Sequence, residues 1–100
     1  MAIQLVFDSA QQFEELVAAQ DYELATSFVE SMLNNINADE EVVSVIEAFF
    51  EEEDTIYDFE IEKVNFSPNF KEFLTIYERE EDYEGCLIIS NAIKTLEGQA

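Results

Sequence analysis

Carboxylates are the most abundant chemically active side chains of this 100-residue chain, which contains 24 Asp and Glu, no His and one Cys. Two carboxyl groups can act together as general acid and base, but 24 of them produce such pairs by chance and single out none. The absence of His excludes Cys-His and Ser-His-Asp nucleophilic sites and removes the commonest transition-metal ligand. Gly85 and Gly98, the two glycines, are too few for a phosphate-binding loop, and no calcium-loop pattern is present. We therefore expect no catalytic residues, no cofactor and no metal site.

The net charge of the chain is −20, and the first 62 residues contain 17 Asp and Glu but no Lys or Arg. A small domain needs a net charge of only about 2 to 8 to stay soluble, and a larger charge destabilises the compact state through self-repulsion. The charge therefore indicates a role beyond solubility. Adaptation to high salt is one alternative explanation, although the many Phe and Ile residues argue against it. Metal chelation by residues 51–54 is another, but adjacent helical residues do not face one ligand.

Acidic residues concentrate in three segments that we predict to bind a partner. In a helix predicted over residues 38–54, Glu40, Glu47, Glu51 and Asp54 lie on one side, opposite a stripe of Val and Phe. Residues 51–54 crowd the negative C-terminal end of that helix, an unfavourable position for carboxylates of the kind expected at functional sites. The other segments are a predicted strand and the turn between two predicted helices. The predicted partner-binding residues are Asp39, Glu40, Glu47, Glu51, Glu52, Glu53, Asp54, Asp58, Glu60, Glu62, Glu78, Glu80, Glu81, Asp82 and Glu84.

The spacing of apolar residues predicts the elements that position these acids. Apolar residues recur at intervals of three and four over most of the chain, whereas residues 3–7 and 56–66 alternate between apolar and polar as strands do. We expect an α+β fold, mostly helical, with about five short helices and one two-stranded antiparallel sheet formed by those two segments, with a bulge at Glu62-Lys63. The chain is predicted to be a single acidic domain over 1–100, with a helical hairpin at 9–36, a helix at 38–54, a strand at 56–66 and a helical hairpin at 68–97.

Cys86 cannot form an internal disulfide because it is the one cysteine of the chain. It lies in a run of apolar residues, and we predict a core thiol on an inward helix face that also carries Tyr83 and Leu87. Residues 1–7 are apolar but too few, and lack the basic flank, for a signal peptide or a membrane span. We therefore expect a cytoplasmic protein, located in the host-cell cytoplasm if a phage encodes it, with no membrane contact.

Two segments of the chain repeat one pattern. Asp-Tyr-Glu occurs at residues 21–23 and 82–84, each time after a predicted helix and before apolar residues at matching intervals. The pattern runs through Asp82, Tyr83, Glu84, Cys86, Ile89, Asn91, Ile93 and Leu96, and through Asp21, Tyr22, Glu23, Ala25, Phe28, Glu30 and Met32. This spacing resembles the UVR motif, the antiparallel helical hairpin through which nucleotide-excision-repair nuclease subunits and some chaperone regulators contact other proteins. Ser90 and Val29 stand where the motif usually has Arg. The resemblance implies protein binding and not catalysis.

The total charge also indicates a kind of partner. A net charge of −20 equals that of about one helical turn of duplex, which carries one phosphate charge per roughly 1.7 Å of axis. A folded acidic protein can therefore enter the Lys- and Arg-lined groove of a nucleic-acid-binding protein and compete with DNA or RNA. In size and composition the chain is similar to phage-encoded antirestriction and anti-CRISPR inhibitors that mimic DNA.

We therefore expect a non-catalytic inhibitor whose partner is a basic nucleic-acid-binding protein, namely a nuclease, a CRISPR effector, a restriction enzyme or a transcription factor. The chain itself is not expected to bind nucleic acid. The alternative is a UVR-like adaptor that contacts its partner through exposed apolar residues near Tyr22 or Tyr83. A monomer and a homodimer are both compatible with the sequence.

Overall fold

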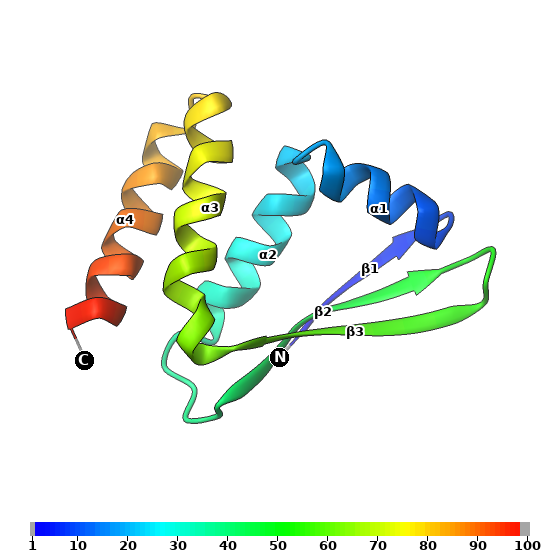
Figure 1. The fold of residues 1–100 in the computed structure, drawn as a ribbon, viewed down its shortest axis with the longest axis horizontal. Coiled ribbons are helices and arrows are strands. Elements are labelled where there is room, and N and C mark those ends of the chain that lie inside the picture. The colour runs from blue at the N-terminus through cyan, green and yellow to red at the C-terminus, as the bar shows by residue number, and fades with distance from the viewer. Residues whose placement is uncertain (1, 99–100) are drawn as a thin grey trace.

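Four α-helices and three β-strands make up residues 2–98, the part of the chain that the computed structural model describes. In chain order they are β1 (Ile3–Phe7), α1 (Ala10–Ala18), α2 (Tyr22–Asn34), β2 (Val42–Phe50), β3 (Thr55–Glu62), a 3₁₀ turn η1 (Lys63–Asn65), α3 (Phe66–Arg79) and α4 (Tyr83–Gly98). Figure 1 shows the strands at one end of the molecule, with α1 above them, and α3 and α4 side by side at the other end. The molecule is long and flat, with dimensions of 43 × 32 × 16 Å.

The sheet has the strand order β1-β2-β3, with β1 parallel to β2 and β2 antiparallel to β3. The prediction of a two-stranded antiparallel sheet made from residues 3–7 and 56–66 is therefore wrong, because β2 lies between these segments. Parallel neighbours need a crossover connection, and α1 and α2 provide it. The fold is α+β as expected, but the described residues contain four α-helices and not five.

Residues 38–54, predicted to be one helix, instead form a loop, strand β2 and the turn 51–54. The misleading signal is a β-bulge, since the pairing of β2 with β3 shifts between Ser44 and Ile46 and leaves Val45 as an inserted residue. Val45 and Ile46 are both fully buried, because a bulge places two residues opposite one and re-aims their side chains. Two successive buried residues interrupt the alternation of a strand and imitate helical spacing.

The boundaries of the C-terminal half also differ from those predicted. β3 ends at Glu62, and the bulge expected at Glu62-Lys63 is the junction between β3 and η1. α3 begins at Phe66, before the expected start at 68, and Pro68 lies in its first turn, where a missing N–H is tolerated. The two predicted helical hairpins are pairs of helices, but α1 and α2 meet at an open angle whereas α3 and α4 run antiparallel (Figure 1).

The two Asp-Tyr-Glu segments form the same turn between helices. Gln20 and Glu81 have positive φ angles of 53° and 59°, and the N–H of the Asp that follows each of them donates to the carbonyl five residues earlier, at 3.0 Å in both turns. The side chains of Asp21 and Asp82 then accept the backbone N–H three residues on, at 2.9 Å. This contact caps α2 and α4. The repeat in the sequence is therefore a repeated turn geometry.

Aromatic rings join the sheet to the helices. The ring of Phe13 on α1 lies 5.1 Å from that of Phe7 on β1 and 4.7 Å from that of Phe59 on β3, centroid to centroid. Phe28 on α2 continues this cluster, with ring centroids 6.4 Å from Phe59 and 5.9 Å from Phe73 on α3. Aromatic pairs of this kind contribute about 0.5–1.5 kcal/mol beyond their burial, so one continuous cluster links the strands to α3.

Lys63 connects the end of β3 to the loop that precedes β2. Its ammonium group donates to the carbonyl oxygens of Ile36 and Ala38 at 2.8 and 2.7 Å. Its backbone N–H donates to the carbonyl oxygen of Glu41 at 2.7 Å. The ammonium also lies 5.5 Å from the centre of the Phe66 ring, within the range of a cation–π interaction. One cation thus holds three segments together.

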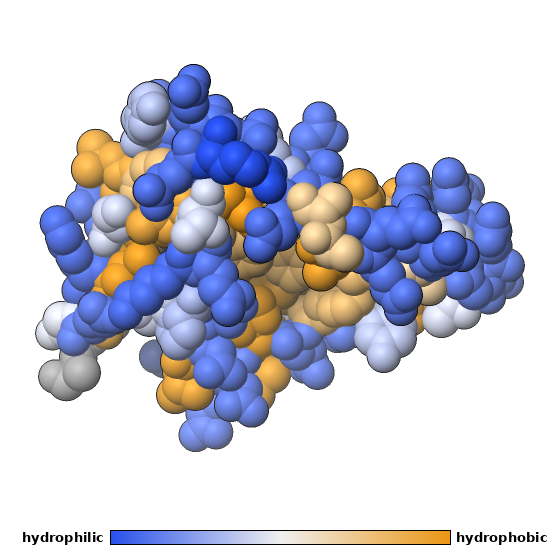
Figure 2. Space-filling model, turned by 45° about the horizontal axis from the view of Figure 1, so that its top comes forward, coloured by the Kyte–Doolittle hydropathy of each residue, from blue (hydrophilic) through white to orange (hydrophobic). Residues whose placement is uncertain are grey.

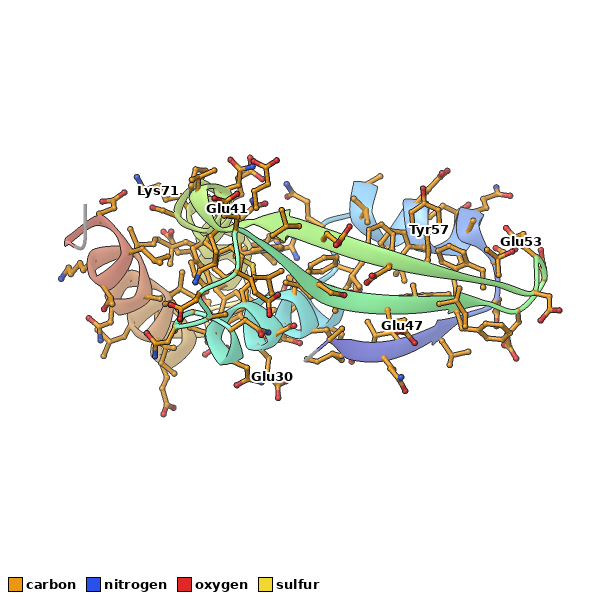
Figure 3. The ribbon with its side chains drawn as sticks, turned by 90° about the horizontal axis from the view of Figure 1, so that it is seen from below. Glu30, Glu41, Glu47, Glu53, Tyr57 and Lys71 are labelled. Atoms are coloured by element: carbon orange, nitrogen blue, oxygen red, sulfur yellow. The ribbon has the colours of Figure 1, made fainter. Side chains whose placement is uncertain are left out.

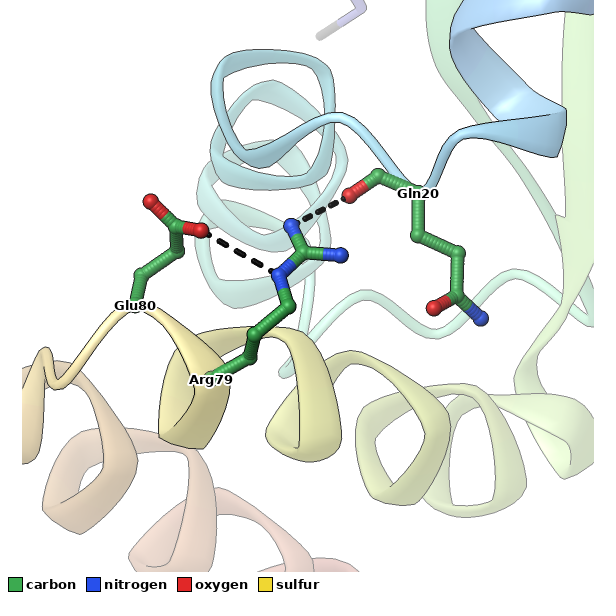
Figure 4. A network of polar contacts seen from close by, with 3 residues as sticks. All are labelled: Gln20, Arg79 and Glu80. Atoms are coloured by element: carbon green, nitrogen blue, oxygen red, sulfur yellow. Dashed lines mark hydrogen bonds and ion pairs between the residues drawn. The ribbon is translucent and has the colours of Figure 1, made fainter.

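Arg79 connects the two helical turns. Its guanidinium donates to the backbone carbonyl of Gln20 at 2.7 Å and pairs with Glu80 at 3.2 Å (Figure 4). Lys71 on α3 pairs with Glu97 on α4 at 2.7 Å. Three of the four basic residues therefore make internal contacts, and two of them use backbone carbonyls, which carry no net charge.

We expect Lys63→Met to lower the free energy of unfolding by about 1–3 kcal/mol, because two carbonyls of the 36–38 loop lose a charged donor. Lys94→Met is the matched control, since Lys94 is exposed on α4 and the same charge is removed. Urea denaturation of both variants measures the difference. Equal losses would show that the charge of Lys63, and not its hydrogen bonds, is what stabilises the fold.

Gly85 allows α4 to approach α3 closely. A Cβ atom at this position would lie 2.5 Å from Cδ2 and 2.6 Å from Cε2 of Tyr77, whereas a Cβ at Gly98 meets nothing within 4 Å. We expect Gly85→Ala to lower the free energy of unfolding by about 1–3 kcal/mol through overpacking, and Gly98→Ala to leave it unchanged or raise it slightly. Thermal denaturation checks both variants, and a neutral Gly85→Ala would contradict the close approach of the two helices.

Candidate protein-binding surface

The outer sheet face is the side of the sheet opposite α1, and it combines acidic and apolar residues. Strand register places its residues in cross-strand rows, namely Val6-Phe49-Ile56, Gln4-Glu47-Asp58 and Ser44-Glu60, with Glu62 at the end of β3. The polar side chains bond across the strands, since the Gln4 amide donates to Glu47 at 3.3 Å and the Ser44 hydroxyl donates to Asp58. Figure 3 looks toward this face, with Glu47 at the front on β2 and α1 behind the strands.

The turn 51–54 lies at the tip of the hairpin formed by β2 and β3, next to the N-terminus of α1. Its backbone is hydrogen-bonded to the end of β1 and to Asp8, which follows β1. The N–H groups of Glu51 and Glu52 donate to the carbonyls of Phe7 and Asp8 at 3.0 and 2.9 Å. The Glu53 carboxylate accepts the backbone N–H of Ala10 at 3.0 Å. The expectation that these acids crowd the negative end of a helix is therefore wrong, because Glu53 lies at the positive end of one.

The structure divides the predicted binding residues into two separate groups. We call hairpin acids those of the β2–β3 hairpin and the loop before it, and turn acids those of the α3–α4 turn. In Figure 1 the α3–α4 turn lies at the top of the two C-terminal helices, whereas the hairpin and the loop before it run along the lower side of the molecule, from below α3 to the tip of the sheet. The hairpin acids are Asp39, Glu40, Glu47, Glu51, Glu52, Glu53, Asp54, Asp58, Glu60 and Glu62, and the turn acids are Glu78, Glu80, Glu81, Asp82 and Glu84. The hairpin acids follow one flat element and form the larger candidate surface.

The turn acids are partly engaged in holding the fold. The hydroxyl of Tyr22 donates to Asp82 at 2.5 Å, and this bond, together with the N–H of Gly85, holds the pKa of the Asp82 carboxyl below its usual range. The same contact raises the pKa of Tyr22, while burial raises the pKa of Tyr77 to about 12. Glu80 pairs with Arg79. Asp82 is thus a helix cap and a bridge between the two turns.

Helix α4 carries apolar side chains that the sequence predicted to face inward. Tyr83 and Leu87, both predicted to face inward, are mostly exposed, and the neighbouring Ile88 is half-exposed. Cys86, predicted to be a core thiol, is partly buried against the core, and desolvation raises the pKa of its thiol. Helical spacing identified the buried Ile89 correctly, but it did not show how much of the helix the rest of the fold covers.

Two clefts lie among the helices of the described residues, and both are lined by apolar and acidic side chains. A cleft of about 390 Å³ between α1, α2, α3 and β3 is lined mainly by apolar side chains, including Leu16, Phe28 and Phe73, and Figure 2 shows apolar surface in this middle part of the molecule. A second cleft, of about 370 Å³, lies between α2 and α4. Within residues 2–98, no three Cys, Asp or Glu residues are grouped so that they could hold a metal ion.

Comparisons with known proteins leave the surface as the main guide to function. No protein-family model matches the chain, and neither the curated proteins nor the solved structures compared with it gave a match. None of the helices within residues 2–98 combines the length and the apolar character needed to cross a membrane.

We expect the melting temperature to rise between 10 mM and 1 M NaCl, because salt screens repulsion among exposed carboxylates. A relief of about 1 kcal/mol corresponds to a rise of about 4–8 °C for a domain of this size. Calorimetry in NaCl and in tetramethylammonium chloride at equal ionic strength separates screening from binding of a particular cation. A flat response would show that bound counter-ions already neutralise the surface, and a rise in NaCl alone would show that Na⁺ binding, not screening, stabilises the fold.

Proposed function

We propose that this protein is a non-catalytic acidic inhibitor that occupies the nucleic-acid-binding groove of a basic protein. The observation that carries the proposal is the lack of internal neutralisation. Residues 2–98 contain all 24 Asp and Glu, and within them Glu80 and Glu97 are the two carboxylates that form ion pairs. A surface of this kind attracts a cationic partner over a long range and raises the rate of association.

Shape and charge together support mimicry of nucleic acid. A duplex as long as the molecule, 43 Å, carries about 25 phosphate charges, and the protein carries a net charge of −20. Asp58, Glu60 and Glu62 follow one another on one side of β3, at intervals of about 6.8 Å because alternate residues of a strand face the same way. The hairpin therefore supplies a regularly spaced line of negative charge.

The expected partner is a nuclease, a CRISPR effector, a restriction enzyme or a transcription factor, because each has a groove lined by Lys and Arg for phosphates. Such a partner acts in the cytoplasm, where an inhibitor encoded by a phage would be made. The inhibitor competes with DNA or RNA for the groove and catalyses no reaction.

An adaptor function, like that of UVR hairpins, is the second candidate. The exposed Tyr83, Leu87 and Ile88 on α4 favour it, because exposed apolar side chains on one helix are suited to contact a partner. An apolar contact of this kind keeps its affinity at high salt, whereas a contact made by carboxylates loses it.

Affinity capture tests the mimic. We expect the tagged protein to retain nucleic-acid-binding proteins from a bacterial lysate, to release them between 50 and 200 mM salt with a fall in affinity of about 10³-fold or more, and to lose them to added duplex DNA or guide RNA. Retention that resists both salt and nucleic acid would favour the adaptor.

Charge reversal identifies the group of acids that makes the contact. The hairpin variant replaces Glu51, Glu52, Asp58 and Glu60 by Lys and leaves Glu53 to cap α1. The control variant makes the same change at Glu14, Glu15, Glu23 and Glu72, which are exposed outside the hairpin and give the same net charge. We expect the hairpin variant to lose at least about tenfold more affinity than the control at 150 mM salt. Equal losses would show that total charge alone drives binding, and full binding by the hairpin variant would exclude the outer sheet face.

A further inference from the structure

The outer sheet face carries an apolar row that a purely electrostatic surface does not need. Val6, Phe49 and Ile56 are aligned across β1, β2 and β3. Val6 is 66% exposed and Ile56 is 63% exposed, and the three side chains line a shallow hollow of about 220 Å³ together with Gln4, Leu5 and Glu47. The open face of a sheet is normally polar, so a row of three apolar side chains on it is unusual.

Carboxylates border this apolar row on both sides along the strands. Glu47 and Asp58 lie in the neighbouring row, about 7 Å away because two residues of a strand span that distance. On the other side, the exposed Asp8 and Glu51 follow directly after the ends of β1 and β2. The row itself spans about 10 Å across three strands. The face is therefore an apolar centre within an acidic rim.

We infer that the apolar row Val6-Phe49-Ile56 is the anchor of the interface and receives an apolar side chain of the partner that is flanked by Lys or Arg. Charge complementarity decides the occupant, because an acidic rim around an apolar centre fits a basic rim around an apolar projection. An apolar centre with a polar rim is also the usual plan of a protein–protein interface. The inference rests on the proposed function and specifies which part of the surface makes the contact.

Other occupants fit this face less well. A second copy of the chain would bring another net charge of −20 against the same acidic rim, and like charges placed together oppose association. A nucleic acid is excluded as the direct ligand by the same repulsion. A basic protein gains from the rim and the centre together, since the rim speeds association while the buried apolar contact slows dissociation.

A pair of matched variants tests the anchor. Val6→Thr with Ile56→Thr removes apolar surface from the row while it keeps β-branched side chains that suit a strand. The control, Val17→Thr with Val64→Thr, also replaces two β-branched apolar residues, which are 50% and 79% exposed outside this face. The probe is the nucleic-acid-binding protein that the wild-type chain captures and that duplex DNA displaces. Circular dichroism and melting curves confirm folding, and the single variant Val6→Thr replaces the double variant if the latter unfolds.

We expect the anchor variant to bind the probe about tenfold more weakly at both 50 and 150 mM NaCl, through faster dissociation and with an unchanged association rate. The control should stay within about twofold of the wild type.

Wild-type binding by the anchor variant, alongside weak binding by the hairpin charge variant, overturns the inference and leaves the proposed function standing. Loss of binding only in the control places the contact outside the outer sheet face. Failure to capture any DNA-displaced protein removes both proposals, and a dimer that the anchor variant dissociates assigns the row to a second copy.

Discussion

The packing of Phe13 against all three strands is the contact on which the rest of the structure depends. Its ring lies near Phe7 on β1, Phe50 on β2 and Phe59 on β3, with centroids 4.7–5.9 Å apart. Burial of one such side chain contributes about 1.5–3 kcal/mol, and it acts at short range. Repulsion among the carboxylates is distributed over a molecule 43 Å long and falls off within about 8–10 Å in physiological salt. A compact aromatic cluster can therefore stabilise a fold whose surface charges repel one another.

The basic residues contribute to the same balance in an indirect way. Lys63 and Arg79 direct their side chains at backbone carbonyls of Ile36, Ala38 and Gln20, so they stabilise loops without neutralising many acids. Hydrogen bonds from charged donors contribute more than neutral ones. Because Lys63 and Arg79 bind loop carbonyls, they do not pair with the carboxylates of the β2–β3 hairpin. The outer sheet face therefore keeps its negative charge.

Sequence patterns located the four helices but also predicted a helix where β2 lies, for reasons visible in particular residues. α1, α2, α3 and α4 each bury one apolar stripe, so their spacing was informative. β2 was mistaken for a helix because the bulge at Val45 makes two successive residues point inward, and the β-branched run Val42, Val43, Val45 and Ile46 was the signal that favoured a strand.

The candidate surface was predictable only in part. Composition alone indicated acidic binding residues, and the alternation of Asp58, Glu60 and Glu62 along β3 placed three of them correctly on one face. The apolar row was missed because residues 38–54 were predicted to be a helix, so Phe49 was not placed between Val6 and Ile56. Their exposure depends on which side of the sheet α1 covers, and that is a property of the packed molecule that local spacing does not encode.

The parallel pairing of β1 with β2 has a consequence for the order in which the chain folds. Gln4 and Glu47 are cross-strand partners although they are 43 positions apart in the sequence. During translation, β1 is therefore synthesised well before β2. Closing such a long segment has an entropic cost that must be met before the sheet is stable, and non-local pairing of this kind slows folding. Helices α1 and α2 can form before β1 is paired. The β2–β3 hairpin then completes the sheet against these helices.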